Sequence, residues 1–297
     1  MAQHPFAGTG VALVTPFDKN GLVDFAALGK IMDYNIRNGV NYFVALGTTG
    51  ESATLSKEEK RDVYLFVKER ARGRAKLVAG IGGNDTNEVA DALESFDSAG
   101  YDAILSVSPY YNKPSQRGIY LHYKILVEAS PLPIILYNVP GRTGSNISFE
   151  TALQLANESD KIIGIKEASG NFSQIMRLVQ NQPKHFRVIS GDDNITLPMM
   201  SVGAIGVISV VAQAFPKLFS RMVNAALEGD FTKAAKPHYR LLESMELFFA
   251  EGSPPGVKAA LNAMGLCENE FRLPIAPVSN ELYRRINAQV GALTKKA

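Results

Sequence analysis

Cysteine, tryptophan and histidine are scarce in this chain of 297 residues. It contains one cysteine, Cys267, and no tryptophan. A single cysteine excludes an intrachain disulfide framework and is typical of a reducing compartment, so we expect a cytoplasmic protein. The four histidines are scattered, with no pair at positions i and i+4. The sequence therefore predicts neither a zinc site nor any other metal site.

Long hydrophobic runs and an excess of one charge are also missing. No stretch approaches about 20 uninterrupted apolar residues, so we expect no membrane span, and the first ten residues lack the pattern of a signal peptide. The 31 basic and 29 acidic residues give a net charge of +2 without a basic block, which argues against nucleic-acid binding. Nucleotide-binding glycine motifs are missing as well.

What the sequence does have is a series of short apolar runs rich in β-branched residues. Such runs are typical of strands buried on both faces of a parallel sheet. They recur about every 20–35 residues, the length of one strand-plus-helix unit. Eight units predict an α/β protein with a closed (β/α)8 TIM barrel rather than an open doubly wound sheet. The runs are 11–14, 42–46, 76–81, 103–107, 134–137, 162–165, 187–189 and 205–210.

Helical patterns fill the segments between these runs. Ser56 begins a capping box, Asp24 opens a helix that should end near Gly39, and Asp85 opens one that should end at Gly100. After about residue 228 only helical spacing remains, and a last helix over 280–290 should stop at Gly291. We therefore predict a catalytic barrel over residues 1–228 and a small helical extension over 229–297.

Chemistry in such a barrel belongs at the carboxyl ends of the strands. Lys166 directly follows the sixth run, so burial should disfavour its ammonium form, and a free amine is a nucleophile toward carbonyls. The alternative is a lysine paired with Glu167. Tyr137 ends the fifth run and could carry protons beside the amine, or it could simply fill the barrel mouth.

Thr48 and Thr49 lie between two glycines, in a turn that could bind an anion or serve only as turn chemistry. Arg142 could capture a carboxylate or lie on the surface.

Two further pairs have structural interpretations. The pair Asp192-Asp193 is interpreted as the N-cap of the next helix rather than as an acid pair or a metal site. The pair Tyr110-Tyr111 is interpreted as packing at an interface.

Several motifs together resemble one known family. They are GTTGES at 47–52, PYYNKP at 109–114, YNVPGRTG at 137–144, GIKEA at 164–168, SGDD at 190–193 and GVISV at 206–210. In this order the chain resembles the dihydrodipicolinate synthase (4-hydroxy-tetrahydrodipicolinate synthase) family over about residues 8–274. That family belongs to the pyruvate-dependent class I aldolases related to N-acetylneuraminate lyase.

The resemblance implies roles for the catalytic residues. Lys166 would form a Schiff base with pyruvate, and Tyr137 would shuttle protons. Thr49, Tyr137 and Tyr111 would form a proton relay, with Tyr111 reaching in from a neighbouring subunit of a homotetramer. The Thr48-Thr49 turn would hold the carboxylate of pyruvate. No metal or organic cofactor is implied.

The resemblance also implies substrate contacts. Ile208 would offer a backbone contact to pyruvate, and Gly191 would lie in the turn after the seventh strand. Arg142 would bind the carboxylate of the second substrate, L-aspartate 4-semialdehyde. The product would be 4-hydroxy-tetrahydrodipicolinate, a precursor of diaminopimelate and lysine.

Regulation by lysine is a separate question. The residues that match the lysine-binding pocket of sensitive family members are Ser52, Ala53, Asn84, Glu88 and Tyr110. Lys57 and Lys60, however, stand where the sensitive pattern has histidines. Two added cations repel the ammonium of lysine, so we hypothesise weak or altered feedback.

Two other functions compete with this one. A sister aldolase, such as an N-acetylneuraminate lyase or a keto-deoxy-sugar aldolase, would keep Lys166 and Tyr137. Arg142 and Thr48 favour the semialdehyde as substrate instead. A non-catalytic barrel that only binds a keto acid would be free to lose the lysine, the tyrosine and Thr49, yet all three are present.

Overall fold

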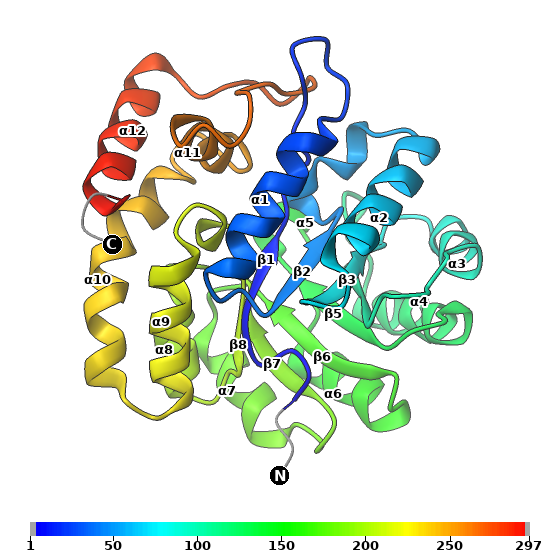
Figure 1. The fold of residues 1–297 in the computed structure, drawn as a ribbon. Coiled ribbons are helices and arrows are strands. Elements are labelled where there is room, and N and C mark those ends of the chain that lie inside the picture. Colours follow the sequence, from blue (N-terminus) through cyan, green and yellow to red (C-terminus); the bar gives the residue numbers. More distant parts are fainter. Residues whose placement is uncertain (1–3, 295–297) are drawn as a thin grey trace.

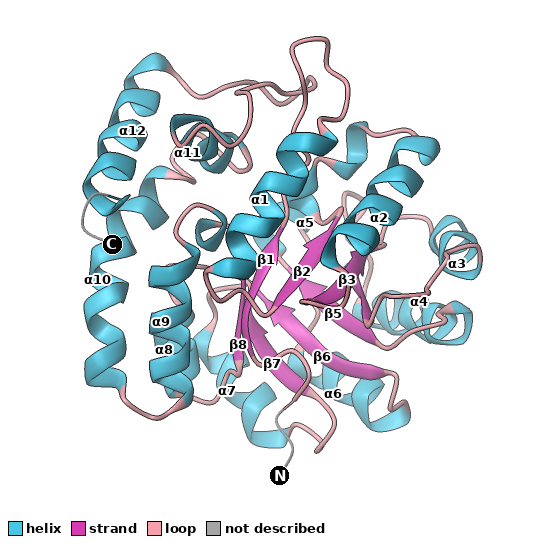
Figure 2. Cartoon of the chain, viewed as in Figure 1, coloured by secondary structure: helices cyan, strands magenta, loops and turns pink. Residues whose placement is uncertain are grey.

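The computed structural model describes residues 4–294, in which eight parallel strands close into a barrel in chain order (Figure 1). Helices surround the strands on the outside (Figure 2). The predicted TIM barrel is therefore confirmed. The strands are β1 (Gly8–Ala12), β2 (Tyr42–Ala45), β3 (Lys76–Gly80), β4 (Ala103–Val107), β5 (Ile134–Asn138), β6 (Ile162–Glu167), β7 (Arg187–Ser190) and β8 (Gly206–Ser209).

The helices follow the same order along the chain. Those up to α9 are α1 (Phe25–Arg37), α2 (Lys57–Ala71), α3 (Thr86–Glu94), α4 (Gln116–Ala129), the short α5 (Pro140–Thr143), α6 (Phe149–Glu158), α7 (Phe172–Asn181), α8 (Thr196–Ser201) and α9 (Pro216–Leu227). Three 3-10 turns are η1 (Thr48–Gly50), η2 (Ser52–Thr54) and η3 (Val211–Gln213). After the barrel come α10 (Phe231–Leu247), α11 (Pro255–Ala263) and α12 (Asn280–Thr294).

The first strand differs from its prediction. It covers Gly8–Ala12 rather than 11–14, because a search for apolar runs passes over glycines. The missing side chain of Gly10 is what the barrel needs, since a Cβ there would lie 2.1 Å from Cε2 of the Tyr42 ring. Tyr42 is fully buried, and its hydroxyl donates a hydrogen bond to the Val207 carbonyl at 3.1 Å. Glycine thus makes room for the side chain that fills the amino-terminal end of the barrel.

Two predicted helix ends are wrong, while the capping box is confirmed. Ser56 and Glu59 cap α2 reciprocally. The helix that Asp85 opens ends at Glu94 rather than Gly100, which instead adopts a positive φ of 85° in the turn before β4. Gly291 does not stop α12, because a glycine costs a helix about 1 kcal/mol without breaking it.

The helices after the barrel share its core. Phe248, which follows α10, stacks on Phe215 with ring centroids 6.0 Å apart, and both side chains belong to one continuous apolar cluster. Arg272 connects the loop before α12 to α2, because its guanidinium donates to both carboxylate oxygens of Glu59 and to the carbonyls of Gly21 and Thr54. The division at residue 228 stays a prediction.

None of the helices within residues 4–294 combines the length and the apolar character that crossing a membrane would require.

The Gly10–Tyr42 contact leads to a stability prediction. Gly10→Ala should lower the midpoint of thermal unfolding by about 2–5 °C, because overpacking of about 1–3 kcal/mol has no free space to relax into. Gly291→Ala is the matched control, since its added methyl group meets nothing within 4 Å and alanine favours the helix. Its midpoint should stay the same or rise. If Gly10→Ala and the unchanged chain had equal midpoints, the Tyr42 ring would be able to move aside and the prediction would be wrong.

Candidate active site

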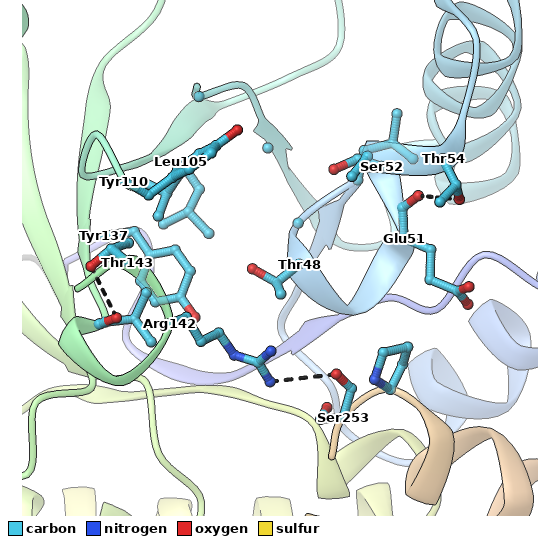
Figure 3. Close-up of a pocket in the computed structure, with 18 of the residues that line it drawn as sticks. Thr48, Glu51, Ser52, Thr54, Leu105, Tyr110, Tyr137, Arg142, Thr143 and Ser253 are labelled. Carbon is cyan, nitrogen blue, oxygen red and sulfur yellow. Dashed lines mark hydrogen bonds between the residues drawn. The ribbon is translucent and has the colours of Figure 1, made fainter. Parts of the chain in front are cut away.

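A pocket of about 360 Å³ opens at the carboxyl ends of the strands, where the sequence predicts the site (Figure 3). Its wall combines the turn after β2, the end of β5, α5 and the segment before α11. These elements contribute Thr48, Tyr137, Arg142, Ser253 and Pro254. Three of the predicted site residues therefore meet in one cavity, although Thr48 follows β2 whereas Tyr137 and Arg142 belong to β5 and the helix after it.

Lys166 lies next to this pocket, near the end of β6. The predicted strand stops at Ile165, but β6 continues through Glu167 and holds the lysine by its ladder to β5, with Lys166 opposite Tyr137. Lys166 is only 5% exposed, and its Nζ lies 4.2 Å from the centroid of the Tyr137 ring. Because Tyr137 also lines the pocket, its ring connects the pocket to the amine.

The alternative pairing of Lys166 with Glu167 is wrong. Successive side chains of a strand point to opposite faces, so the two cannot meet. Glu167 is fully buried on the other face and accepts hydrogen bonds from Asn138 and Gln174, both at 3.0 Å, and from the Ser169 N–H at 2.7 Å. Within residues 4–294, no carboxylate comes within ion-pair distance of the Lys166 amine.

Gly191 gives the lysine its space. A Cβ at this position would lie 3.0 Å from Cγ and 3.1 Å from Cε of Lys166. The backbone of Gly191 is fixed at the same time, because its N–H donates to the Glu167 carbonyl at 2.8 Å. The structure thus shows why a residue without a side chain follows β7.

The predicted turn after β2 is present, and we call residues 48–51 the 48–51 turn. It begins with η1, in which the Gly50 N–H donates to the Gly47 carbonyl at 2.9 Å. Thr15, in the loop after β1, supports the turn, because the Thr15 hydroxyl donates to the Gly50 carbonyl at 2.6 Å. Thr49 is buried, whereas Thr48 is exposed to the pocket.

Arg142 is held at the edge of the pocket by α5. Its Nη2 lies 3.5 Å from the Ser253 carbonyl, which belongs to the segment before α11 (Figure 3). The guanidinium is exposed and forms no ion pair with a carboxylate in the described part of the chain. It is therefore free to receive an anionic group from the pocket.

Tyr111 does not line the pocket of its own chain. Its side chain is 87% exposed, and its φ of 74° is unusual for a bulky residue. The Tyr111 N–H donates to the Thr143 carbonyl at 3.2 Å, so α5 holds the strained backbone in place. The neighbouring Tyr110 does line the pocket. Packing of the pair at an interface stays a prediction.

Ile208 and Asp193 are buried and lie outside the pocket lining. Ile208 is buried in β8, in the same interior cluster as Tyr137. Asp193 does not cap α8 as predicted; its carboxylate instead accepts the N–H groups of Val210 and Val211, directly after β8, at 3.0 Å each. Burial raises the pKa of Asp193 to about 6.

Residues 4–294 hold no group of three or more His, Cys, Asp or Glu side chains suited to a metal.

The predicted regulatory residues do not all line this pocket, and their grouping into a lysine site stays a prediction. Ser52, Ala53 and Tyr110 line the pocket. Asn84 lies just before α3 and Glu88 lies in the first turn of that helix, and neither residue lines the pocket.

Sequence reasoning missed one buried ion pair beside the site, between Lys258 of α11 and Glu51 of the 48–51 turn. A lone lysine between Val257 and Ala259, in an otherwise apolar segment, was the available signal.

Comparisons with known proteins give one consistent result. The family model described as "Dihydrodipicolinate synthetase family" matches residues 5–293. The 4-hydroxy-tetrahydrodipicolinate synthase of Parabacteroides distasonis is 50% identical, and all of both chains is covered. That of Flavobacterium psychrophilum is 51% identical over 99% of this chain and all of the relative. The crystal structure of dihydrodipicolinate synthase from Aquifex aeolicus has a TM-score of 0.93 at 43% identity, with 98% of each chain covered. This chain belongs to the dihydrodipicolinate synthetase family.

Proposed function

We propose that this chain is a 4-hydroxy-tetrahydrodipicolinate synthase, a lyase that condenses pyruvate with L-aspartate 4-semialdehyde on the route to diaminopimelate and lysine. Relatives of about 50% identity over their full length carry that name, which favours it over a sister aldolase or a non-catalytic barrel. The structural observation that carries the proposal is a buried amine with no carboxylate at ion-pair distance among residues 4–294, beside a phenol and a pocket.

Lys166 supplies the covalent chemistry in this proposal. Its free amine attacks the ketone of pyruvate, and the ketone oxygen leaves as water after Tyr137 has delivered a proton. The protonated Schiff base then draws electrons from the methyl group, which loses a proton and becomes an enamine. No metal or organic cofactor is needed, because the iminium itself is the electron sink.

The enamine then forms the new bond. Its carbon attacks the aldehyde carbon of the semialdehyde, and the aldehyde oxygen takes up a proton to become the 4-hydroxyl group. The amine of the semialdehyde next attacks the iminium carbon, closes the ring and displaces Lys166, which regains its free amine. One water is released overall, and the lysine is unchanged.

Binding of the two acids follows from the pocket wall. We assign the carboxylate of pyruvate to the 48–51 turn, with a backbone contact from Ile208, because Thr48 faces the pocket and Thr49 is buried beside it. We assign the carboxylate of the semialdehyde to Arg142, whose planar guanidinium suits two parallel hydrogen bonds. Gly191 keeps the lysine stem free to reach the first acid.

Assembly and location complete the proposal. We infer a homotetramer, a dimer of tight dimers, in which Tyr111 joins the proton relay of its neighbour with Thr49 and Tyr137. Its exposed ring on a strained backbone supports this, because strain persists where a function depends on it. One solved relative is described as the first monomeric dihydrodipicolinate synthase variant.

We place the enzyme in the cytoplasm, in keeping with the free thiol of Cys267.

The Schiff base can be tested directly. Borohydride reduction with saturating pyruvate should attach a permanent adduct to the peptide that contains Lys166, and Lys166→Ala should lose the adduct and at least about a thousandfold in kcat. Arg142→Ala is the matched control, because it keeps the amine: the adduct should form while kcat/KM for the semialdehyde falls. An unmodified Lys166 in folded, unchanged protein would end the proposal.

The role of Tyr111 gives a second test. Light scattering should find a tetramer, and Tyr111→Phe should keep that mass while kcat falls by about tenfold to a hundredfold, because only the relay hydroxyl is lost. A fully active monomer would contradict a tyrosine supplied by the neighbouring chain.

Feedback by lysine should be weak. Lys57 and Lys60 lie in the first turn of α2, where Glu59 is already paired with Arg272 and Glu58 accepts from the Ser56 hydroxyl. These acids are therefore poorly placed to offset the two cations. At about 1 mM L-lysine we expect less than half inhibition in a steady-state assay. Half-maximal inhibition at micromolar lysine would refute this, and a Lys57→Gln/Lys60→Gln variant should be more sensitive.

A further inference from the structure

Lys258 and Glu51 form an ion pair closed off from solvent, which the proposed chemistry does not use. Lys258 Nζ lies 2.5 Å from Glu51 Oε1, and the two side chains are 0% and 1% exposed. Taking two charges out of water offsets much of their mutual attraction, so a pair this deeply buried is poor evidence for stability alone. Its position beside the 48–51 turn points to a role in the site.

The surroundings of Lys258 leave its ammonium little freedom. Nζ donates to the Glu270 carbonyl at 3.0 Å and lies over the rings of Phe17 and Phe271, 4.3 and 4.7 Å from their centroids. Burial lowers the pKa of Lys258 and raises that of Glu51, while each charge stabilises the other. Glu51 Oε2 has no hydrogen-bond partner within residues 4–294, and in that range Lys258 is the cation at ion-pair distance from the carboxylate, with Arg272 acting on it from farther away.

Glu51 is in turn rigidly connected to the threonines. Its backbone has a φ of 51°, a left-handed conformation that side chains rarely adopt. Its N–H donates to the Thr48 carbonyl at 3.2 Å, and its carbonyl accepts from the Thr54 N–H at 3.0 Å. The carboxylate of Glu51 points away from Tyr137, toward the segment that leads to α11 (Figure 3). A shift of Glu51 would therefore move Thr48.

The other end of the ion pair is close to the second substrate contact. Lys258 lies in the first turn of α11, and its N–H donates to the Pro254 carbonyl at 3.1 Å. The preceding carbonyl, that of Ser253, accepts from Arg142. The first turn of α11 and the segment directly before it thus touch the parts of the pocket assigned to both substrates.

We propose that Lys258 is a positioning residue for the reaction: its ion pair with Glu51 holds the 48–51 turn where the carboxylate of pyruvate must bind. This inference rests on the proposed function. It makes the helices after the barrel part of the active-site architecture, because the cation that fixes the turn comes from α11.

Three variants test the assignment. Lys258→Met leaves the Glu51 carboxylate buried without a partner, so the midpoint of thermal unfolding should fall by about 5–8 °C and kcat/KM for pyruvate by at least about tenfold. Glu51→Gln/Lys258→Met removes both charges, so its midpoint should return close to that of the unchanged chain. Lys233→Met is the control, because its pair with Glu228 is exposed and should change neither quantity.

The double variant decides between positioning and mere stability. If the pair positions the turn, stability returns but kcat/KM for pyruvate stays low, with KM raised more than kcat is lowered, and saturating pyruvate still gives a borohydride adduct at Lys166. Recovery of both stability and kcat/KM would overturn the assignment while the adduct upheld the proposed function. An unchanged chain that formed no adduct would overturn both.

Discussion

The alternation of side chains along β6 is the constraint on which the rest of the site depends. Lys166 points into the barrel and Glu167 points out, so the strand buries an amine and keeps the carboxylate of the next residue away from it. Glu167 has a structural role, because it accepts hydrogen bonds from Asn138 of β5 and Gln174 of α7 and so connects the strands to that helix. The hydrogen bonds of Glu167 on the outside of the barrel thereby hold the strand that carries the Lys166 amine on the inside.

The second feature of this arrangement is that the Lys166 amine is buried without an ion-pair partner among residues 4–294. A lysine in a barrel interior is stable only if its stem is packed and its amine reaches a polar or π-rich surface. The Tyr137 ring provides that surface, and the space left by Gly191 accommodates the stem. The amine, the phenol and the glycine come from β6, β5 and the turn after β7, so the closed barrel is what keeps them together.

Local pattern predicted most of this structure, and its failures have physical causes. Seven strands were located by apolar runs, whereas β1 was displaced because glycines carry no hydropathy signal. Thr48, Tyr137 and Arg142 could be placed together because the ends of parallel strands meet. The link between Lys258 and Glu51 could not, since only folding brings α11 to the turn after β2. Tyr111 shows the same limit, because its surroundings within one chain do not include the pocket.

The side chains at the amino-terminal end of the barrel affect the side from which a molecule can reach Lys166. The side chain of Tyr42 fills that end: its ring packs against Phe6 with 5.3 Å between the ring centroids, and its hydroxyl donates to the Val207 carbonyl. The path to Lys166 therefore begins at the other end of the barrel, from the pocket that Arg142 borders. Because Lys166 is buried and Arg142 is exposed, a molecule at the amine lies deeper along this path than one at the guanidinium.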